Sequence, residues 1–158
     1  MTMVVLVSMK SKDPSTHIGA VVVDDDNSVR TIGYNGLPRG ANDNIPERNE
    51  KPLKYYYYEH AERNAVYNAA LMGISLKGCR MYTNGIPCAD CARAVIQSGI
   101  KEVIVHSNWE DNKPSNWVES CAIGGDLLKE CGVKINICNK PTITEIKGLR
   151  HGDEVDYI

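Results

Sequence analysis

Two short motifs near the middle of the sequence combine residue types that bind metals. The first is His-Ala-Glu at positions 60–62, and the second is Pro-Cys-Ala-Asp-Cys at positions 87–91. Cys88 and Cys91 lie three positions apart in the first turn of a predicted helix, so both sulfurs project from one face. The helix dipole and the free N–H groups favour thiolates there. Together with the imidazole of His60, they predict a zinc site, because zinc prefers such ligands.

Three protein ligands leave a tetrahedral zinc with one open position, as in catalytic sites. Zinc lowers the pKa of water held there to about 7, and Glu62, which is not a ligand, is expected to move that water's protons. His60 and Glu62 can serve one site only at a helix entrance, because a helix points residues i and i+2 to different sides. The two motifs together are typical of zinc enzymes that remove a nucleobase amine by attack at C4 of cytosine. Backbone groups near Ala61 and Ile86 would then orient the base.

Other interpretations of the cysteine pair are a redox site and a closed structural zinc site. No thioredoxin-like segment surrounds the pair, which argues against redox chemistry. A closed site needs a fourth ligand, for which His17, His106 and Cys79 are candidates. We favour the catalytic interpretation because both motifs occur together with a predicted strand between them.

The elements around the motifs predict an α/β fold. Hydrophobic periodicity indicates an opening helix ending near residue 10 and helices over 60–71, 89–98 and 117–131. Strands are expected over 18–23 and 29–34, which form a hairpin, and over 80–83, 103–105 and 133–137. The alternation of helix and strand predicts parallel later strands joined by right-handed crossovers. The polar segment 36–54 is expected to be a binding loop, and the tyrosines at 55–58 alternate faces if that run is extended.

The composition is that of one soluble domain. The 158 residues suffice for one hydrophobic core, and the formal net charge of −2 argues against nucleic acid as a partner, although a local basic pocket could hold a small anion. No apolar run is long enough to span a membrane.

Residues 1–9 lack the features of a signal peptide, so we expect a cytoplasmic protein. The remaining cysteines are then expected to be buried thiols: Cys79, Cys121, Cys131 and Cys138.

Five further segments resemble one known family. They are Ser-Lys-Asp-Pro-Ser-Thr (11–16), Gly-Ala-Val (19–21), Gly-Tyr-Asn-Gly-Leu-Pro-Arg-Gly (33–40), Glu-His-Ala-Glu-Arg-Asn-Ala (59–65) and Ile-Gln-Ser-Gly-Ile-Lys (96–101). With the zinc motifs, they resemble the deoxycytidylate (dCMP) deaminases of the cytidine deaminase superfamily. The similarity covers roughly residues 3–137. Gly-Tyr-Asn-Gly favours this branch over relatives that act on tRNA adenosine, guanine or free cytidine.

The resemblance implies a three-layer α/β sandwich with a five-stranded mixed sheet flanked by helices, a Zn²⁺ cofactor, and conversion of dCMP to dUMP with release of ammonia. It also implies a homo-oligomer, commonly a hexamer, and dCTP or dTTP as effectors of some members. Asn35 would contact the sugar of the substrate. Arg39 could bind the 5′-phosphate, because guanidinium recognises phosphate, although a solvated loop arginine fits equally well.

We expect residues 1–138 to form the deaminase domain and leave 139–158 as an unassigned tail. The segment from Trp109 to Trp117 matches the family poorly and could shape the pocket. The alternatives are the same chemistry on another free nucleotide (dCTP, CMP or a 5-substituted dCMP), the same chemistry on a base in nucleic acid, and a non-catalytic zinc protein. Glu62 argues against the last, because a closed zinc site does not need it.

Overall fold

The computed structural model describes residues 1–111, 115–140, 147–150 and 153–156. Within them the helices are α1 (Thr2–Ser8), α2 (Lys54–Tyr57), α3 (Ala61–Leu71), α4 (Ala89–Gln97), α5 (Ser107–Asp111) and α6 (Ser115–Glu130), with a 3-10 turn at Pro46–Asn49. The strands are β1 (Gly19–Val23), β2 (Val29–Tyr34), β3 (Arg80–Thr83), β4 (Glu102–His106), β5 (Lys134–Cys138), β6 (Lys147–Arg150) and β7 (Asp153–Asp156).

A five-stranded mixed sheet forms the centre of the fold, with the order β2-β1-β3-β4-β5. The predicted hairpin is confirmed, because β1 pairs antiparallel with β2. β1 also pairs antiparallel with β3, whereas β3, β4 and β5 run parallel, as the alternation of helix and strand predicts. β6 and β7 pair with each other in a separate two-stranded sheet.

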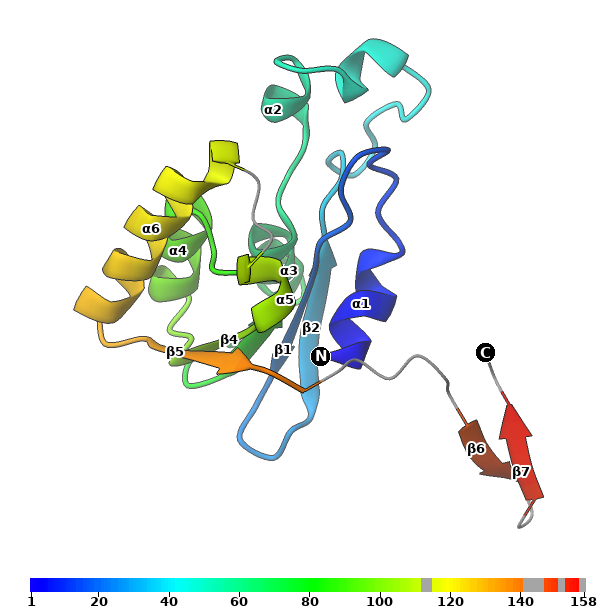
Figure 1. Cartoon of the computed structure of the whole chain (residues 1–158), viewed down its shortest axis with the longest axis vertical. Helices are drawn as coiled ribbons and strands as arrows, with labels where there is room; N and C mark the ends of the chain where they lie inside the picture. Colours follow the sequence, from blue (N-terminus) through cyan, green and yellow to red (C-terminus); the bar gives the residue numbers. More distant parts are fainter. Residues whose placement is uncertain (112–114, 141–146, 151–152, 157–158) are drawn as a thin grey trace.

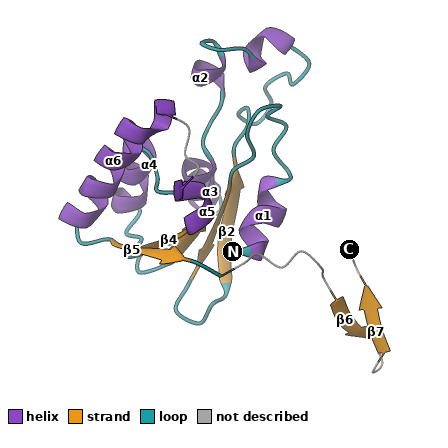
Figure 2. Ribbon diagram, viewed as in Figure 1, coloured by secondary structure: helices purple, strands orange, loops and turns teal. Residues whose placement is uncertain are grey.

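Helices cover both faces of the sheet and make the predicted three-layer sandwich (Figures 1 and 2). Successive side chains of a strand point to opposite faces. In β1, Val21 and Val23 therefore pack against Val4 and Val7 of α1. The neighbouring Val22 joins the main core on the other face, where α3 and α4 lie.

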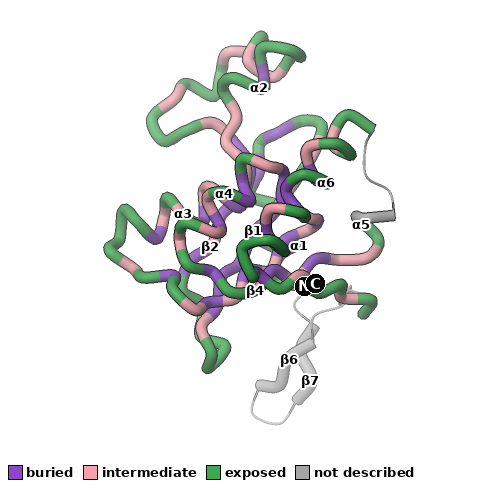
Figure 3. The backbone as a smooth tube through the Cα atoms, turned by 90° about the vertical axis from the view of Figure 1, so that its left-hand side faces the viewer, coloured by how far each residue is buried: buried purple, intermediate pink, exposed green. Residues whose placement is uncertain are grey.

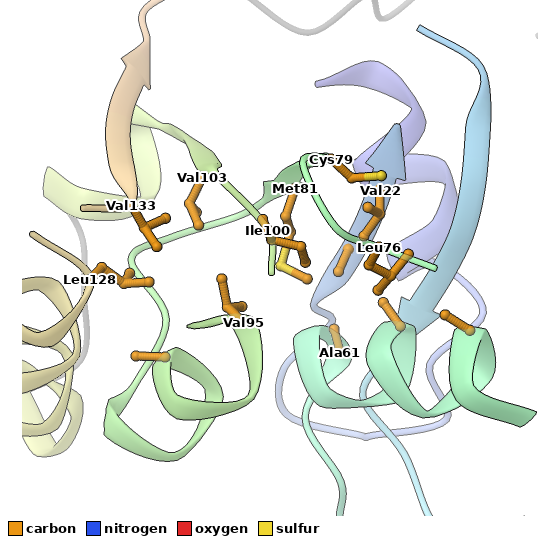
Figure 4. Packing of buried hydrophobic residues seen from close by; sticks show 14 of the residues in the cluster. Val22, Ala61, Leu76, Cys79, Met81, Val95, Ile100, Val103, Leu128 and Val133 are labelled. Carbon is orange, nitrogen blue, oxygen red and sulfur yellow. The ribbon is translucent and has the colours of Figure 1, made fainter. Parts of the chain in front are cut away.

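The main core lies between the sheet and the α3–α4 layer (Figure 4). Met81, Val95 and Val103 are completely buried there. Figure 3 shows buried residues concentrated along the strands and the helix faces that adjoin them, whereas the segment carrying α2 is largely exposed. This core fixes the starts of α3 and α4 relative to each other, and those starts carry the metal-binding motifs.

Three details differ from the expectations or lie outside the described residues. The tyrosine run does not alternate in an extended strand, because Lys54–Tyr57 forms helix α2, which leaves Tyr56 84% exposed. Cys131 is exposed rather than buried, since it follows the last turn of α6, and Cys138 at the end of β5 is half-buried. Within the unassigned tail, residues 141–146 lie outside the described residues. None of the helices in the described part of the chain has the length and apolarity needed to cross a membrane.

Candidate metal centre and the cavity beside it

Three side chains that can bind a metal meet at the starts of α3 and α4. His60 is the N-cap of α3 and Cys88 is the N-cap of α4, both with extended backbone, while Cys91 lies in the first turn of α4. The His60 Nδ1 atom lies 3.5 Å from Cys88 Sγ and 3.4 Å from Cys91 Sγ. The three ligand atoms lie within 4.8 Å of one another. One imidazole nitrogen and two sulfurs at this spacing fit a single zinc ion.

Glu62 lies beside this cluster without joining it. Its side chain is buried, and Oε2 lies 3.6 Å from Cys91 Sγ. His60 precedes the helix with extended backbone, whereas Glu62 is its second residue. The change of backbone conformation brings both side chains to one site, as predicted for a motif at a helix entrance.

Burial and mutual hydrogen bonding set the charges of these groups. The hydrogen bond from Cys91 lowers the pKa of Cys88 to about 4, and bonding to His60 acts in the same direction. The pKa of Cys91 is raised, because the hydrogen bond with Cys88 stabilises the protonated Cys91 thiol and because this thiol is buried. Burial is the largest single influence on His60 and lowers its pKa, but the hydrogen bond to Cys88 and the negative charges of Glu62 and Cys88 together outweigh it, and the imidazole pKa is raised. Burial raises the pKa of Glu62, which favours a carboxyl that can both take and give a proton.

A cavity of about 160 Å³ opens beside the cluster. Its wall includes Asn35, Ala61 and Ile86, three residues predicted to contact the substrate. The remaining lining residues come from the 13–18 loop, from the α2 region, from the metal motifs and from the α5–α6 region: Asp13, Ser15, Thr16, Ile18, Lys51, Lys54, Tyr55, Tyr58, Glu59, His60, Glu62, Gly85, Cys88, Trp109, Asn116, Trp117 and Cys121.

Arg39, which is proposed from the sequence to bind the 5′-phosphate, is not among the residues that line this cavity. Its exposed side chain hydrogen bonds to Asn68 Oδ1 on α3. The lysines of the lining are Lys51 and Lys54. Lys54 is paired with Asp13, whereas Lys51 has no carboxylate partner among the described residues. Lys51 therefore adds a positive charge to the cavity lining, whereas Arg39 lies outside that lining.

None of the candidates for a fourth ligand joins the cluster. Cys79 belongs to the main core, and His17 is exposed. His106 Nε2 lies 3.1 Å from the carbonyl oxygen of Lys140. Within the described residues, the cluster is therefore limited to the three predicted side chains. A zinc ion held by three protein ligands would keep a position open for water or substrate, as catalytic zinc sites do.

Helix α6 supplies a wall that the two motifs do not reveal. The ring of Trp117 meets the His60 imidazole edge to face, with centroids 5.2 Å apart. One and two turns further along α6, Cys121 packs against the two ligand cysteines and Gly124 faces the Pro87–Cys88 backbone. This spacing of four and then three residues is that of one helix face. It is visible in the sequence, but the sequence does not show which surface the face covers.

Two glycines allow close approach at the metal motifs. A Cβ atom on Gly33 of β2 would lie 2.2 Å from the Ala61 carbonyl oxygen at the start of α3. One on Gly124 would lie 2.1 Å from the Pro87 carbonyl oxygen, next to Cys88. Both distances are far below van der Waals contact, so only glycine fits without displacing the backbone that carries His60 or Cys88.

The fold and the site define a class of protein: an α/β sandwich with a His-Cys-Cys metal site at two helix starts and a buried glutamate beside it. Residues 1–107 match the family model described as the cytidine and deoxycytidylate deaminase zinc-binding region. The chain is 43% identical over 113 residues to deoxycytidylate deaminase of Mus musculus, covering 68% of this chain and 62% of the relative. It is 41% identical over 151 residues to a protein of Drosophila melanogaster named "Probable deoxycytidylate deaminase", covering 88% and 71% of the two chains.

The crystal structure of dCMP deaminase from the cyanophage S-TIM5 in complex with dCMP and dUMP superimposes with a TM-score of 0.66 at 26% identity, covering 86% of this chain and 91% of that one. The chain belongs to the cytidine and deoxycytidylate deaminase family. The predicted resemblance, the fold class and the zinc cofactor are thereby confirmed. The chain spans about three fifths of the length of the mammalian relatives that it matches, 62% in each case.

Proposed function

We propose that this chain is a zinc-dependent hydrolytic deaminase that converts dCMP to dUMP with release of ammonia. The observation that carries the proposal is the position of buried Glu62 beside the His60, Cys88 and Cys91 cluster, at the wall of one cavity. This arrangement combines metal ligands, a proton carrier and space for a small substrate.

The cluster fits zinc by the chemistry of its donors. His60 offers Nδ1, and Cys88 and Cys91 offer sulfur, while the described residues include no fourth side chain in the cluster. When bound, zinc supplies Lewis-acid chemistry that makes water a nucleophile at neutral pH. The hydrogen bonds that lower the Cys88 pKa to about 4 favour the thiolate that metal binding needs.

Glu62 would carry the protons of the reaction. It accepts a proton from the attacking water as the C4–O bond forms, and it passes that proton to N3 of the cytosine ring. It then takes the second proton from the C4 hydroxyl and delivers it to the exocyclic nitrogen as the C4–N bond breaks, so that ammonia leaves and a carbonyl remains at C4. Its raised pKa suits a group that is protonated and deprotonated in each cycle.

The cavity wall supports a nucleotide as the substrate. Ala61 and Ile86 border the space next to the cluster, where the base would be oriented, and Asn35 lines the same cavity. Lys51 provides a positive charge for a phosphate. The relatives support the choice of dCMP, because the mouse protein is named deoxycytidylate deaminase and the S-TIM5 enzyme was solved with dCMP and dUMP.

Other parts of the prediction belong to the same proposal. They are a homo-oligomer, commonly a hexamer in this family, control by dCTP and dTTP, a cytoplasmic location, and a deaminase domain over residues 1–138. Each stays a prediction. A non-catalytic zinc protein is not favoured, because Glu62 is buried with Oε2 3.6 Å from Cys91 Sγ and is not one of the three side chains of the cluster.

The test is a comparison of substrates with zinc-loaded protein. Ammonia release and the ultraviolet change are measured with dCMP, dCTP, CMP, deoxycytidine, guanine and a cytosine-containing oligonucleotide, and Glu62→Ala serves as the inactive control. We expect dCMP to be turned over well above the others and the Glu62 variant to be inactive. Faster turnover of another compound would replace the substrate, and no turnover of any compound by zinc-loaded protein would refute the proposal.

A further inference from the structure

A buried ion pair lies in the cavity wall, apart from the metal cluster. Lys54 Nζ lies 2.7 Å from Asp13 Oδ1 and 2.6 Å from Asp13 Oδ2, and the exposed fractions of the two side chains are 9% and 3%. Lys54 Nζ also donates to Ser15 Oγ at 2.6 Å. Lys54 begins α2, whereas Asp13 belongs to the loop between α1 and β1. The pair therefore fastens two distant segments of the chain together at the cavity.

The Asp13 carboxylate also organises its own loop. Asp13 Oδ1 accepts hydrogen bonds from the backbone N–H of Ser15 at 2.8 Å, from the Ser15 hydroxyl at 2.9 Å and from the backbone N–H of Thr16 at 3.2 Å. Burial raises the pKa of the Asp13 carboxyl, but the hydrogen bonds from Lys54 and Ser15 together have the larger effect and lower it. The pKa of Asp13 is therefore below its ordinary value. The group is thus held as a charged acceptor.

The other carboxylate oxygen holds Asn35. The Asn35 Nδ2 group donates to Asp13 Oδ2 at 3.0 Å and to the Thr16 carbonyl oxygen at 2.9 Å, while Asn35 Oδ1 accepts from the Ile18 backbone N–H at 2.8 Å. A carboxylate only accepts hydrogen bonds, so it fixes which side of the amide faces it. Both amide hydrogens of Asn35 are used in these bonds. The side chain can therefore form one further hydrogen bond, as an acceptor through the second lone pair of Oδ1.

Stability alone gives little reason for such a pair. Desolvation of two charges offsets most of their attraction, and an apolar pair of similar volume often serves a fold equally well. Asp13, Ser15, Asn35 and Lys54 all line the cavity beside the metal cluster. The network thus keeps a hydrogen-bond acceptor of Asn35 in one orientation at a site where a sugar hydroxyl could donate to it.

We propose that Asp13 and Lys54 are positioning residues for the substrate: their ion pair holds the 13–18 loop and the Asn35 amide so that Asn35 Oδ1 accepts a hydrogen bond from the 3′-hydroxyl of the deoxyribose. This inference rests on the proposed deaminase function. It assigns a role in substrate orientation to two charged side chains that lie outside the metal cluster.

The test compares dCMP with 2′,3′-dideoxycytidylate, which lacks the 3′-hydroxyl. The variants are Asp13→Asn, Lys54→Met, the double variant and Lys54→Arg, which keeps the charge. Lys101→Met is the matched control, because Lys101 forms an exposed ion pair with Asp25, with Nζ and Oδ1 2.5 Å apart. In the unmodified protein we expect a clear preference for dCMP in kcat/KM.

In Asp13→Asn, Lys54→Met and the double variant, the KM for dCMP should rise about tenfold, because the hydrogen bond from the 3′-hydroxyl to Asn35 is lost. The preference over the dideoxy substrate should fall towards unity while zinc content stays unchanged. Lys54→Arg should keep most of the preference, and Lys101→Met should keep all of it.

Two results overturn the proposal. In the first, the folded, zinc-loaded double variant keeps the preference for dCMP over the dideoxy substrate. Asn35 is then positioned without the Asp13–Lys54 ion pair. In the second, the double variant and Lys54→Arg both fail to fold, because the pair is then a structural requirement. Failure of the unmodified protein to deaminate any cytosine compound would refute the proposed function instead, and would be seen before any variant is measured.

Discussion

At the scale of single residues, two carboxyl groups of the cavity are held in opposite ways. Glu62 is buried without a cationic side chain bonded to it among the described residues, and burial raises its pKa. Asp13 is also buried, but Lys54 and Ser15 donate to it, and its pKa is lowered. The raised pKa suits Glu62 to exchanging protons, whereas the lowered pKa suits Asp13 to remaining charged. The hydrogen-bond partners of the two carboxyl groups account for this difference.

We expect Glu62→Gln to reduce deamination by a factor of about 10² to 10⁴, the usual contribution of a general acid–base group. Zinc content should be unchanged, because Glu62 is not in the ligand cluster. Rates from ammonia release and zinc from metal analysis check this. A variant that keeps more than a tenth of the activity would contradict the role given to Glu62.

The same substitution should make the metal-free protein more stable. The folded pKa of Glu62 is raised above its ordinary value of 4.5. The folded state therefore retains the proton longer, so the unmodified protein loses stability as the pH rises from 4.5 through the folded pKa. The variant carries a neutral amide, which does not ionise, so it does not lose stability in this way as the pH rises. Urea unfolding in the presence of a chelator should show a stability difference that grows over this range and then stays constant. A difference that is the same at every pH would contradict the raised pKa.

Variants of Lys51 and Arg39 test which of the two side chains binds the 5′-phosphate. Lys51→Gln should lower kcat/KM for dCMP by about tenfold, the effect of losing one charge-assisted hydrogen bond. Activity on deoxycytidine, which has no phosphate, should stay the same. Arg39→Gln is the matched control, since Arg39 bonds to Asn68 outside the cavity lining. The reverse pattern, with loss of activity on dCMP in Arg39→Gln alone, would support Arg39 as the phosphate-binding residue.

At the scale of elements, the metal cluster depends on how closely neighbouring segments approach the starts of α3 and α4. β2 crosses the start of α3 at Gly33, and α6 lies against the Pro87–Cys88 backbone at Gly124. These contacts act on the backbone of His60 and Cys88 rather than on their side chains. The ligand geometry is therefore a property of packed elements as well as of the two motifs.

Gly124→Ala should reduce zinc content and activity together by displacing the backbone at Cys88. Gly125→Ala is a matched control on the same helix, because its added Cβ would lie 3.5 Å from Ile86 Cγ2, which is ordinary contact. Both changes improve intrinsic helix propensity by about 1 kcal/mol, so a difference between them reports the close approach alone. The zinc content of both variants is measured by metal analysis. Equal zinc content would contradict the prediction and would show that α6 shifts to make room for the added methyl group.

At the scale of the whole molecule, the sheet and both of its main packing layers lie within residues 1–138. The five-stranded sheet ends with β5, and both large core clusters are built from residues before position 138. β6 and β7 pair only with each other among the described strands. The five strands of the larger sheet therefore all lie within residues 1–138, and the domain division stays a prediction.

We expect a chain ending at residue 138 to fold and to bind zinc. Its melting temperature should stay close to that of the longer chain, because the sheet and cores are retained. Thermal unfolding and metal analysis of both chains provide the comparison. Loss of the cooperative transition on truncation would place the tail within the domain.

From the sequence alone, His60, Cys88 and Cys91 are predicted as metal ligands and Glu62 as the proton carrier. The order of the five strands of the main sheet and of the helices α1, α3, α4 and α6 is predicted as well. Ligand identity depends on side-chain chemistry and short spacing, and the alternation of helices and strands follows from hydrophobic periodicity. Both are local properties that a single sequence contains. The confirmed hairpin and the parallel later strands follow from the same local signals.

Only the tertiary structure decided which distant side chains reach the cavity. Arg39 looked suited to a phosphate from its type and its loop, but its side chain bonds to α3, whereas Lys51 lines the space. The pairing of Asp13 with Lys54 joins residues 41 positions apart, and nothing in their local sequence predicts that partner. The tyrosine run became helical beside these loops. Loop direction and long-range pairing depend on packing against the rest of the chain, and so they require the fold itself.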